Sequence, residues 1–110
     1  MRGRAAAELL SLPVRMHGIQ LGVPVDALLD ERADRLLGLE VRCGDGNHRF
    51  LPFSVARVQA DEISIDSALT LIDERDLEFY RRRSRRLADL GYAEPWIDED
   101  GAVHEALSAA

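Results

Sequence analysis

The sequence predicts an all-β fold: a small β-barrel of five to six short antiparallel strands, followed by one C-terminal α-helix and an acidic tail. Three observations predict it. Apolar and polar residues alternate in short runs between residues 12 and 72, a strong hairpin turn interrupts these runs at residues 44–47, and helical signals begin only at Asp73. We divide the chain accordingly into an N-terminal arm (1–11), the barrel (12–72), an amphipathic Arg-rich helix (73–91) and the tail (92–110).

Period-two alternation marks the individual strands. Successive side chains of a strand point to opposite faces, so one apolar set in each run faces the core and residues such as Glu40 and Arg42 face out. Turns separate the runs and no helical period lies between them, which is typical of a closed or nearly closed barrel. The apolar sets are Leu12, Val14 and Met16; Val23, Val25, Ala27 and Leu29; Leu37, Leu39, Val41 and Cys43; Phe50, Leu51 and Phe53; Val55 and Val58; Ile63 and Ile65; and a continuation at Leu69 and Leu71.

Two local features refine this strand pattern. Asp45-Gly46 lies between two alternating runs, and such a pair supplies the positive φ that a tight hairpin needs. Pro24 has no N–H to donate to a ladder, so we expect it at a sheet edge or at a bulge.

The helix is predicted from its end signals. Asp73 is an expected N-cap, acidic residues occupy the first turns, and arginines precede Gly91, which is typical of a C-terminal stop. The tail that follows carries five acids and no Arg. Two arrangements remain open for it: a disordered segment, or one that docks through Trp96.

Composition narrows the classes of protein to which the chain can belong. A net charge of −6 argues against a general nucleic-acid binder, and all 14 basic residues are arginines, whose planar guanidinium groups suit carboxylate or phosphate partners. The single cysteine, Cys43, excludes an intramolecular disulfide. Glu8 and Pro13 interrupt the apolar start of the chain, so we expect no signal peptide, no membrane span and a cytoplasmic location.

Four short segments carry a resemblance when they are taken in order: Leu21–Asp30, Leu37–Val41, Leu51–Val55 and Asp61–Ile65. Together they resemble the PRC-barrel family, named from the cytoplasmic domain of the photosynthetic reaction centre H subunit, and the resemblance covers about residues 12–72. The same barrel forms the C-terminal domain of a bacterial ribosome maturation factor. It implies a compact barrel used for protein or ribonucleoprotein contacts, with no shared active site and no shared cofactor.

The Arg-rich run at residues 81–86 is the most conspicuous candidate site. On an α-helix its five arginines spread over about 200° of the circumference and form a basic collar. Such a collar can bind phosphate or an acidic partner, or it can be a solvated face with i,i+4 ion pairs, which is the more common case. We select Phe79 and Leu90 for apolar contact with a partner, and Arg82, Arg83 and Arg86 for contact with an acidic group.

The uneven distribution of charge along the chain adds a third interpretation of the basic collar. The net charge is −2 for residues 1–72 (8 Arg, 10 acids), +1 for 73–91 (6 Arg, 5 acids) and −5 for 92–110 (no Arg, 5 acids). The tail can therefore compete for the arginines within its own chain or across a dimer.

No catalytic or metal-binding pattern stands out. The chain has no CxxC or HExxH spacing, and Ser54, Ser64 and Ser67 lack a nucleophile-elbow context. Cys43 falls on the apolar face of its strand, where a buried, inert thiol is expected. We therefore predict no enzyme, no cofactor and no metal.

The sequence thus favours a non-catalytic protein-protein interaction module, homodimeric, with a protein partner of unknown identity. The alternative is a ribosome- or RNA-associated factor that binds phosphate through the Arg-rich helix, with no role for DNA. Steep salt dependence would indicate the alternative, because phosphate contacts release counterions.

Overall fold

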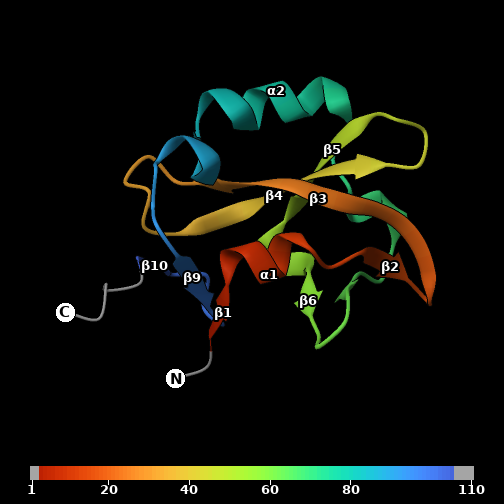
Figure 1. Ribbon diagram of the computed structural model, residues 1–110. Helices are drawn as coiled ribbons and strands as arrows, with labels where there is room; N and C mark the ends of the chain where they lie inside the picture. Colours follow the sequence, from red (N-terminus) through yellow and green to blue (C-terminus); the bar gives the residue numbers. More distant parts are fainter. Residues whose placement is uncertain (1–2, 106–110) are drawn as a thin grey trace.

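A computed structural model describes residues 3–105 as one β-rich unit with helices on both sides of the main sheet (Figure 1). The strands are β1 (Gly3–Ala5), β2 (Val14–Met16), β3 (Ile19–Leu29), β4 (Leu36–Cys43), β5 (His48–Pro52), β6 (Arg57–Val58), β7 (Ile63–Ser64), β8 (Arg85–Arg86), β9 (Pro95–Asp98) and β10 (Val103–Glu105). The α-helices are α1 (Ala6–Leu10) and α2 (Glu74–Arg82), and single 3-10 turns lie at η1 (Phe53–Val55), η2 (Ala68–Thr70) and η3 (Leu87–Asp89).

The main sheet has the strand order β5-β4-β3-β2-β7-β6, and β8 pairs with β3. The long strands β3 and β4 form its centre, and the predicted hairpin turn connects β4 to β5. In that turn Gly46 has a φ of +86°, and the Asp45 carboxylate accepts a hydrogen bond from the Asn47 N–H at 2.9 Å. The hairpin prediction is therefore confirmed.

Pro24 lies at a bulge, one of the two positions expected for it. The register between β3 and β4 shifts between Pro24 and Asp26, and Val25 is left exposed between them. The bulge allows a residue without an N–H to lie within a central strand of the sheet.

The sheet is strongly curved, but it does not close into a barrel. In the described part of the chain, β5 and β6 are the two ends of the strand order and do not pair with each other. One pairing also differs from the expected antiparallel pattern, because β2 and β7 run parallel. The expectation of a β-rich fold is confirmed, whereas the expectation of closure by antiparallel strands alone is not met.

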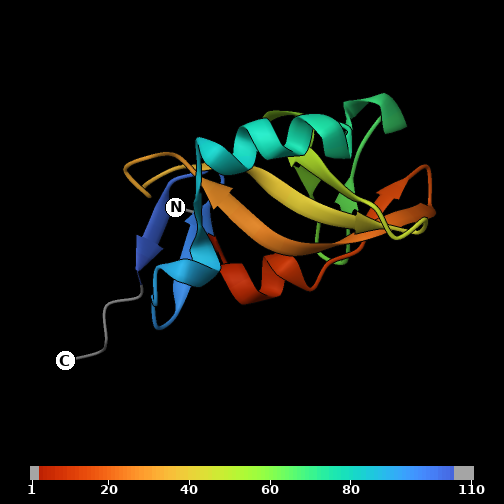
Figure 2. The same cartoon turned by 90° about the horizontal axis from the view of Figure 1, so that it is seen from above.

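Two apolar clusters lie on opposite faces of the sheet. The larger one fills the space between the sheet, α1 and the small sheet described below, and it includes Leu9, Leu39, Leu51, Ile63 and Ile97. The smaller one, under α2, consists of Leu28, Phe50 and Leu77, with Ile72 and Tyr80 packed against it. Seen from above in Figure 2, α2 and α1 lie along the two sides of the β3–β4 ribbon.

The two ends of the described chain share a second sheet. Its three strands have the order β1-β9-β10, with Gly3 opposite Asp98 and Val103 opposite Ile97. Residues 3–11 therefore do not form a separate arm, because Ala6 and Leu9 are buried in the main core. The acidic tail is likewise structured up to residue 105, and residues 106–110 lie outside the described range.

Two further segments differ from the sequence-based expectation. Leu69 and Leu71 do not extend the sheet: Leu69 belongs to η2 and is 93% exposed. The helix predicted for residues 73–91 ends at Arg82, and the chain then becomes strand β8 and turn η3.

Candidate functional site

Helix α2 has one face on the sheet and one face in solvent. Its inner face is fixed by Leu77, which is fully buried, and by Tyr80, whose ring stacks on Phe50 with centroids 4.3 Å apart. Phe79 points outward and is 51% exposed. The guanidinium of Arg83 lies over the Phe79 ring, 3.7 Å from its centroid, in a cation–π contact.

Four exposed residues form what we call the outer α2 surface: Arg75, Phe79, Arg82 and Arg83. Positions 75, 79, 82 and 83 follow the spacing of one helix face, and three of the four residues are cations. The sequence predicts Phe79, Arg82 and Arg83 as contact residues. It does not point to Arg75, because Arg75 lies outside the arginine run at residues 81–86.

The remaining two selected residues face elsewhere. Leu90 is half-buried and packs against the main core, so it is not a surface anchor. Arg86 lies in β8, where its guanidinium approaches Asp26 at 4.0 Å and Glu40 at 3.8 Å. The prediction of a basic collar around one helix is therefore wrong. Helix α2 ends at Arg82, and Arg81 and Arg86 bind carboxylates of the sheet.

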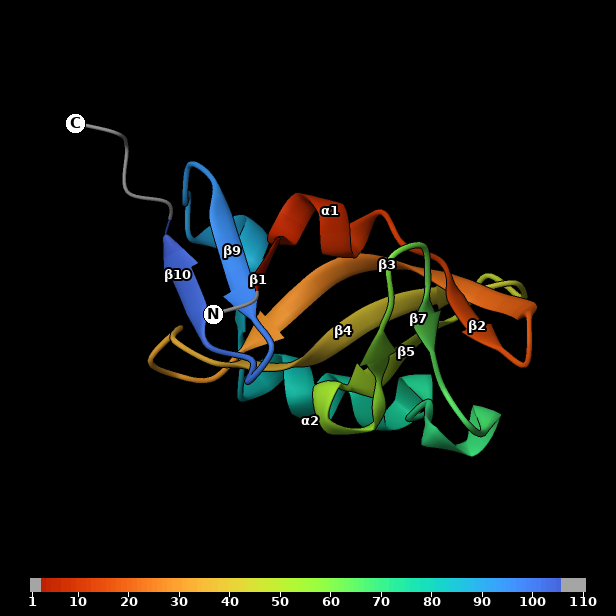
Figure 3. The same ribbon diagram turned by 90° about the horizontal axis from the view of Figure 1, so that it is seen from below.

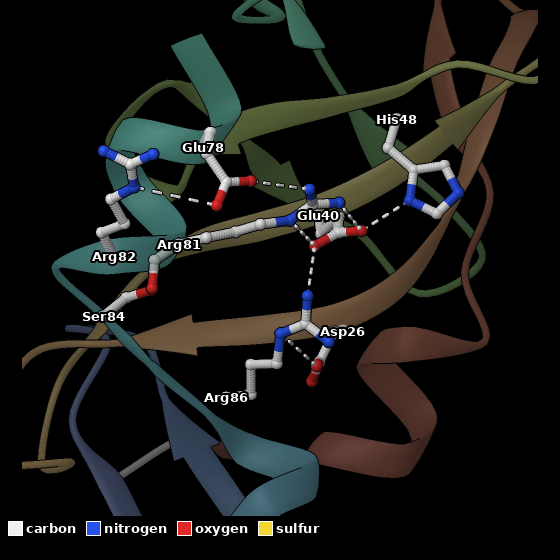
Figure 4. A network of polar contacts seen from close by, with 8 residues as sticks. All are labelled: Asp26, Glu40, His48, Glu78, Arg81, Arg82, Ser84 and Arg86. Atoms are coloured by element: carbon white, nitrogen blue, oxygen red, sulfur yellow. Dashed lines mark hydrogen bonds and ion pairs between the residues drawn. The ribbon is translucent and has the colours of Figure 1, made fainter. Parts of the chain in front are cut away.

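Glu40 is the centre of the polar network in Figure 4. The period-two pattern places Glu40 on the face of β4 away from the main core, and it does lie there, but Arg81 and Arg86 cover it and leave 4% of the residue exposed. Its carboxylate accepts two hydrogen bonds from Arg81, at 2.8 and 3.1 Å, and lies 2.5 Å from His48 Nδ1. The two bonds from Arg81 tie α2 to β4, and Arg81 also binds Glu78 within the helix at 3.2 Å.

The two buried carboxylates of this network have opposite pKa shifts. Burial alone would raise the pKa of Glu40, but hydrogen bonds from Arg81 and His48 outweigh it and hold the pKa below its ordinary value. Burial raises the pKa of Asp26, and the hydrogen bond from the Ala27 N–H, 2.8 Å long, opposes that rise only in part. Glu40 is thus stabilised as an anion, whereas the charge of Asp26 is disfavoured.

The contacts of Asp98 in the acidic tail are with groups of the tail itself and not with the arginine run at residues 81–86. Asp98 is buried, accepts hydrogen bonds from the N–H groups of Asp100 and Ala102, and lies 3.0 Å from His104. Trp96 stacks on His104 with centroids 4.2 Å apart, a contact within the tail itself, and the tail residue that is buried in the main core is Ile97. Among the ion pairs of residues 3–105, none joins the tail to Arg81–Arg86, so binding of the tail to the arginines of its own chain is not observed there.

Cys43 is buried at the end of β4, as expected, and is unpaired. Within residues 3–105 no group of three or more His, Cys, Asp or Glu side chains is arranged to hold a metal ion. None of the helices in this range is long and apolar enough to cross a membrane.

Comparison with known proteins adds no family. No protein-family model matches the chain, and no curated protein is significantly similar to it in sequence.

Proposed function

We propose that this chain is a non-catalytic interaction module that binds an acidic segment of a protein partner on the outer α2 surface. The observation that carries the proposal is the half-exposed ring of Phe79 under the guanidinium of Arg83. Phe79 lies in α2 and Arg83 directly follows it, and the sheet fixes this helix from below through Leu77 and Tyr80.

The composition of the surface supports this role. Aromatic residues and arginine are enriched at protein interfaces and supply most hot-spot energy. Phe79 offers an apolar anchor. Arg82 is 74% exposed at its side chain, and within residues 3–105 it makes only one weak ion pair, with Glu78 at 3.9 Å. A partner with an acidic residue beside an apolar one would match this arrangement, because bidentate carboxylate–guanidinium contacts are strong and directional.

A protein partner is favoured over RNA by the distribution of the arginines. Two of the five cations in the 81–86 run, Arg81 and Arg86, already face buried carboxylates. The structure therefore gives less support than the sequence does to phosphate binding by a continuous basic collar. What remains on the outer α2 surface is a small group of arginines beside one aromatic ring.

The fold-level part of the proposal is a PRC-barrel-like module. The resemblance still rests on the four short segments and their order along residues 12–72, and a curved, β-rich sheet is compatible with it. We also propose a homodimer in the cytoplasm. Light scattering on the purified chain would show twice the monomer mass if the dimer forms.

The test is affinity capture from the native host with the wild-type chain and with a Phe79→Ala/Arg83→Ala variant. We expect a protein retained by the wild type in nuclease-treated lysate and lost by the variant. Truncation of a hot-spot residue costs about 2 kcal/mol, so the affinity of the isolated partner should fall about 30-fold.

Leu69→Ala is the matched control, because Leu69 is 93% exposed but lies outside the outer α2 surface. It should retain the partner. If every partner is lost on nuclease treatment and binding weakens steeply with salt, the chain binds RNA and the proposal is wrong.

A further inference from the structure

A second candidate site lies on the other side of the molecule from α2. A cleft of about 860 Å³ opens between the small sheet and the η1–β6 segment. Figure 3, seen from below, shows the small sheet at the left and β7, the partner of β6, farther to the right along the β3–β4 ribbon. Leu9, Leu36 and Ile97 line the cleft as buried residues, and Leu37, 38% exposed, lies at its mouth.

Two sheet edges border this cleft. In the described part of the chain β6 pairs only with β7, and β1 pairs only with β9, so each has one unpaired side. Residues from both strands, among them Val58 of β6 and Gly3 of β1, line the cleft. Unpaired edges present rows of N–H and C=O groups that can pair with an added strand.

The hydrogen-bond pattern identifies which main-chain groups point outward. The Gln59 N–H donates to the Glu62 carbonyl at 2.8 Å and closes the β6–β7 hairpin. Bonded and non-bonded pairs alternate along an antiparallel ladder, so Val58, opposite Ile63, directs its N–H and C=O away from β7. The Ile63 N–H agrees with this pattern, because it donates to Pro13 on the other side of β7.

The same alternation applies to the small sheet. The Asp98 N–H donates to the Ala102 carbonyl, so the main-chain groups of Ile97 turn toward β1 and pair with Arg4. The N–H and C=O of Gly3 therefore point to the unpaired side of β1. Arg4 connects the two borders, because its guanidinium donates to the Gln59 carbonyl at 2.8 Å.

We propose that the cleft binds an extended peptide segment of a partner protein, added as a strand alongside β6. The outward N–H and C=O of Val58 form the main-chain hydrogen bonds. Every second side chain of the peptide enters the apolar floor formed by Leu9, Leu36 and Ile97, since alternate side chains of a strand share one face.

The rim of the cleft favours a peptide over a small anion. Arg35 and Arg57 line it together with Glu99 and Asp100, so charges of both signs surround the apolar floor. Arg35 donates to a neutral partner, the main-chain carbonyl of Asp100, at 3.0 Å. A segment with polar or charged residues at the alternate positions fits such a rim, whereas a simple anion would meet the three carboxylates of Asp98, Glu99 and Asp100.

The test uses a random heptapeptide library displayed on phage, selected on the immobilised full chain and counter-selected on a Leu37→Asp variant. We expect enriched peptides with apolar residues at every second position. A synthetic copy should shift the amide NMR signals of Gly3 and Val58. Methylation of its main-chain nitrogen opposite Val58 should weaken binding at least tenfold, because the methyl group removes one ladder hydrogen bond.

Two variants separate loss of binding from loss of fold. Leu69→Asp makes the same substitution at an exposed leucine outside the cleft and should leave affinity unchanged. Ser54→Tyr, at an exposed lining position, places a larger side chain in the mouth and should also weaken binding at least tenfold. Thermal unfolding of each variant checks that the fold is intact.

The proposal is overturned if no peptide distinguishes the wild type from Leu37→Asp, or if N-methylation has no effect on affinity. It is independent of the role of α2. The Phe79→Ala/Arg83→Ala variant should select the same peptides as the wild type, and peptides that fail to bind that variant would belong to the outer α2 surface instead.

Discussion

At the scale of the single residue, Glu40 shows how a charged side chain can be almost completely buried on one face of a sheet. Its carboxylate is hydrogen-bonded to His48 of β5 and Arg81 of α2, and it forms an ion pair with Arg86 of β8. Hydrogen bonds to a charged group contribute more to stability than neutral ones do. The contact also joins three elements that are separate in the sequence.

Glu40→Gln should lower the free energy of unfolding by about 2 kcal/mol at pH 7, because Arg81 then loses its charged acceptor. The pKa of Glu40 is lower in the fold than in the unfolded chain. Its contribution is therefore present above the unfolded pKa, and it is lost as the pH falls through the folded pKa. Urea unfolding of both proteins between pH 7 and pH 3 measures this difference, which should shrink toward acid.

Glu62→Gln is the matched control, since Glu62 binds Arg15 at 3.5 Å in a more exposed position. It should change stability by less than about 1 kcal/mol, because this ion pair keeps partial contact with solvent. A difference for Glu40→Gln that stays constant down to pH 3 would contradict the role of its charge.

Asp26→Asn should have the opposite effect. Burial raises the pKa of Asp26, so its negative charge opposes folding at neutral pH, and an amide oxygen can still accept from the Ala27 N–H. We expect the free energy of unfolding at pH 7 to rise by about 1 kcal/mol, the usual scale for one buried polar group. The gain should vanish below the raised pKa, where the wild-type carboxyl is already neutral; equal stability at pH 7 would count against it.

The sequence predicts the exposure of some of these side chains and not of others. Exposure of Phe79 followed from its helical position, because it lies away from Leu77 and Tyr80. The burial of Glu40 does not follow from the sequence. Period-two alternation assigns a residue to one face of the sheet, but it does not show which side chains cover that face. A helix that continued to Gly91 would leave Leu90 free to contact a partner, but α2 ends at Arg82 and Leu90 packs against the main core.

At the scale of the element, the early end of α2 has a cause outside the helix. The sequence contains no breaker before Gly91, so local signals extend the helix to that residue. Arg85 and Arg86 instead pair with Leu29 and Leu28 of β3. Tertiary pairing overrides local helix propensity here, as it commonly does.

Leu77→Ala should detach α2 from the sheet. Leu77 is fully buried between Leu28 and Phe50, and such a truncation costs about 3 kcal/mol through lost burial and a residual cavity. Hydrogen exchange should show the amides of α2 opening before those of β3 and β4. Arg75→Ala, on the outer side of the same helix, should change stability by less than about 0.5 kcal/mol.

At the scale of the whole molecule, the chain closes on itself through its two ends. Residues 3–5 pair with β9, and β9 also carries β10, so segments about 90 residues apart form one sheet. Strands of three or four residues are too short for a distinct alternation pattern. For that reason the sequence places the centre of the sheet well and assigns both ends to separate appendages.

Deletion of residues 92–110 should destabilise the whole fold. It removes β9, exposes one side of β1 and takes Ile97 out of the main core. Loss of that side chain alone costs about 3 kcal/mol, so the shortened chain should unfold at clearly lower urea concentration. A cooperative transition at the wild-type midpoint would show that the tail is not part of the cooperative unit.

The small sheet also determines how the molecule responds to mechanical load. Strands β1 and β10 both run antiparallel to β9, with Gly3 opposite Asp98 at one end and Glu105 opposite Pro95 at the other. Tension applied through the two ends of the described chain therefore acts along the strands in opposite directions. The hydrogen bonds on both sides of β9 are then loaded together in shear, and they do not open one after another as in a zipper.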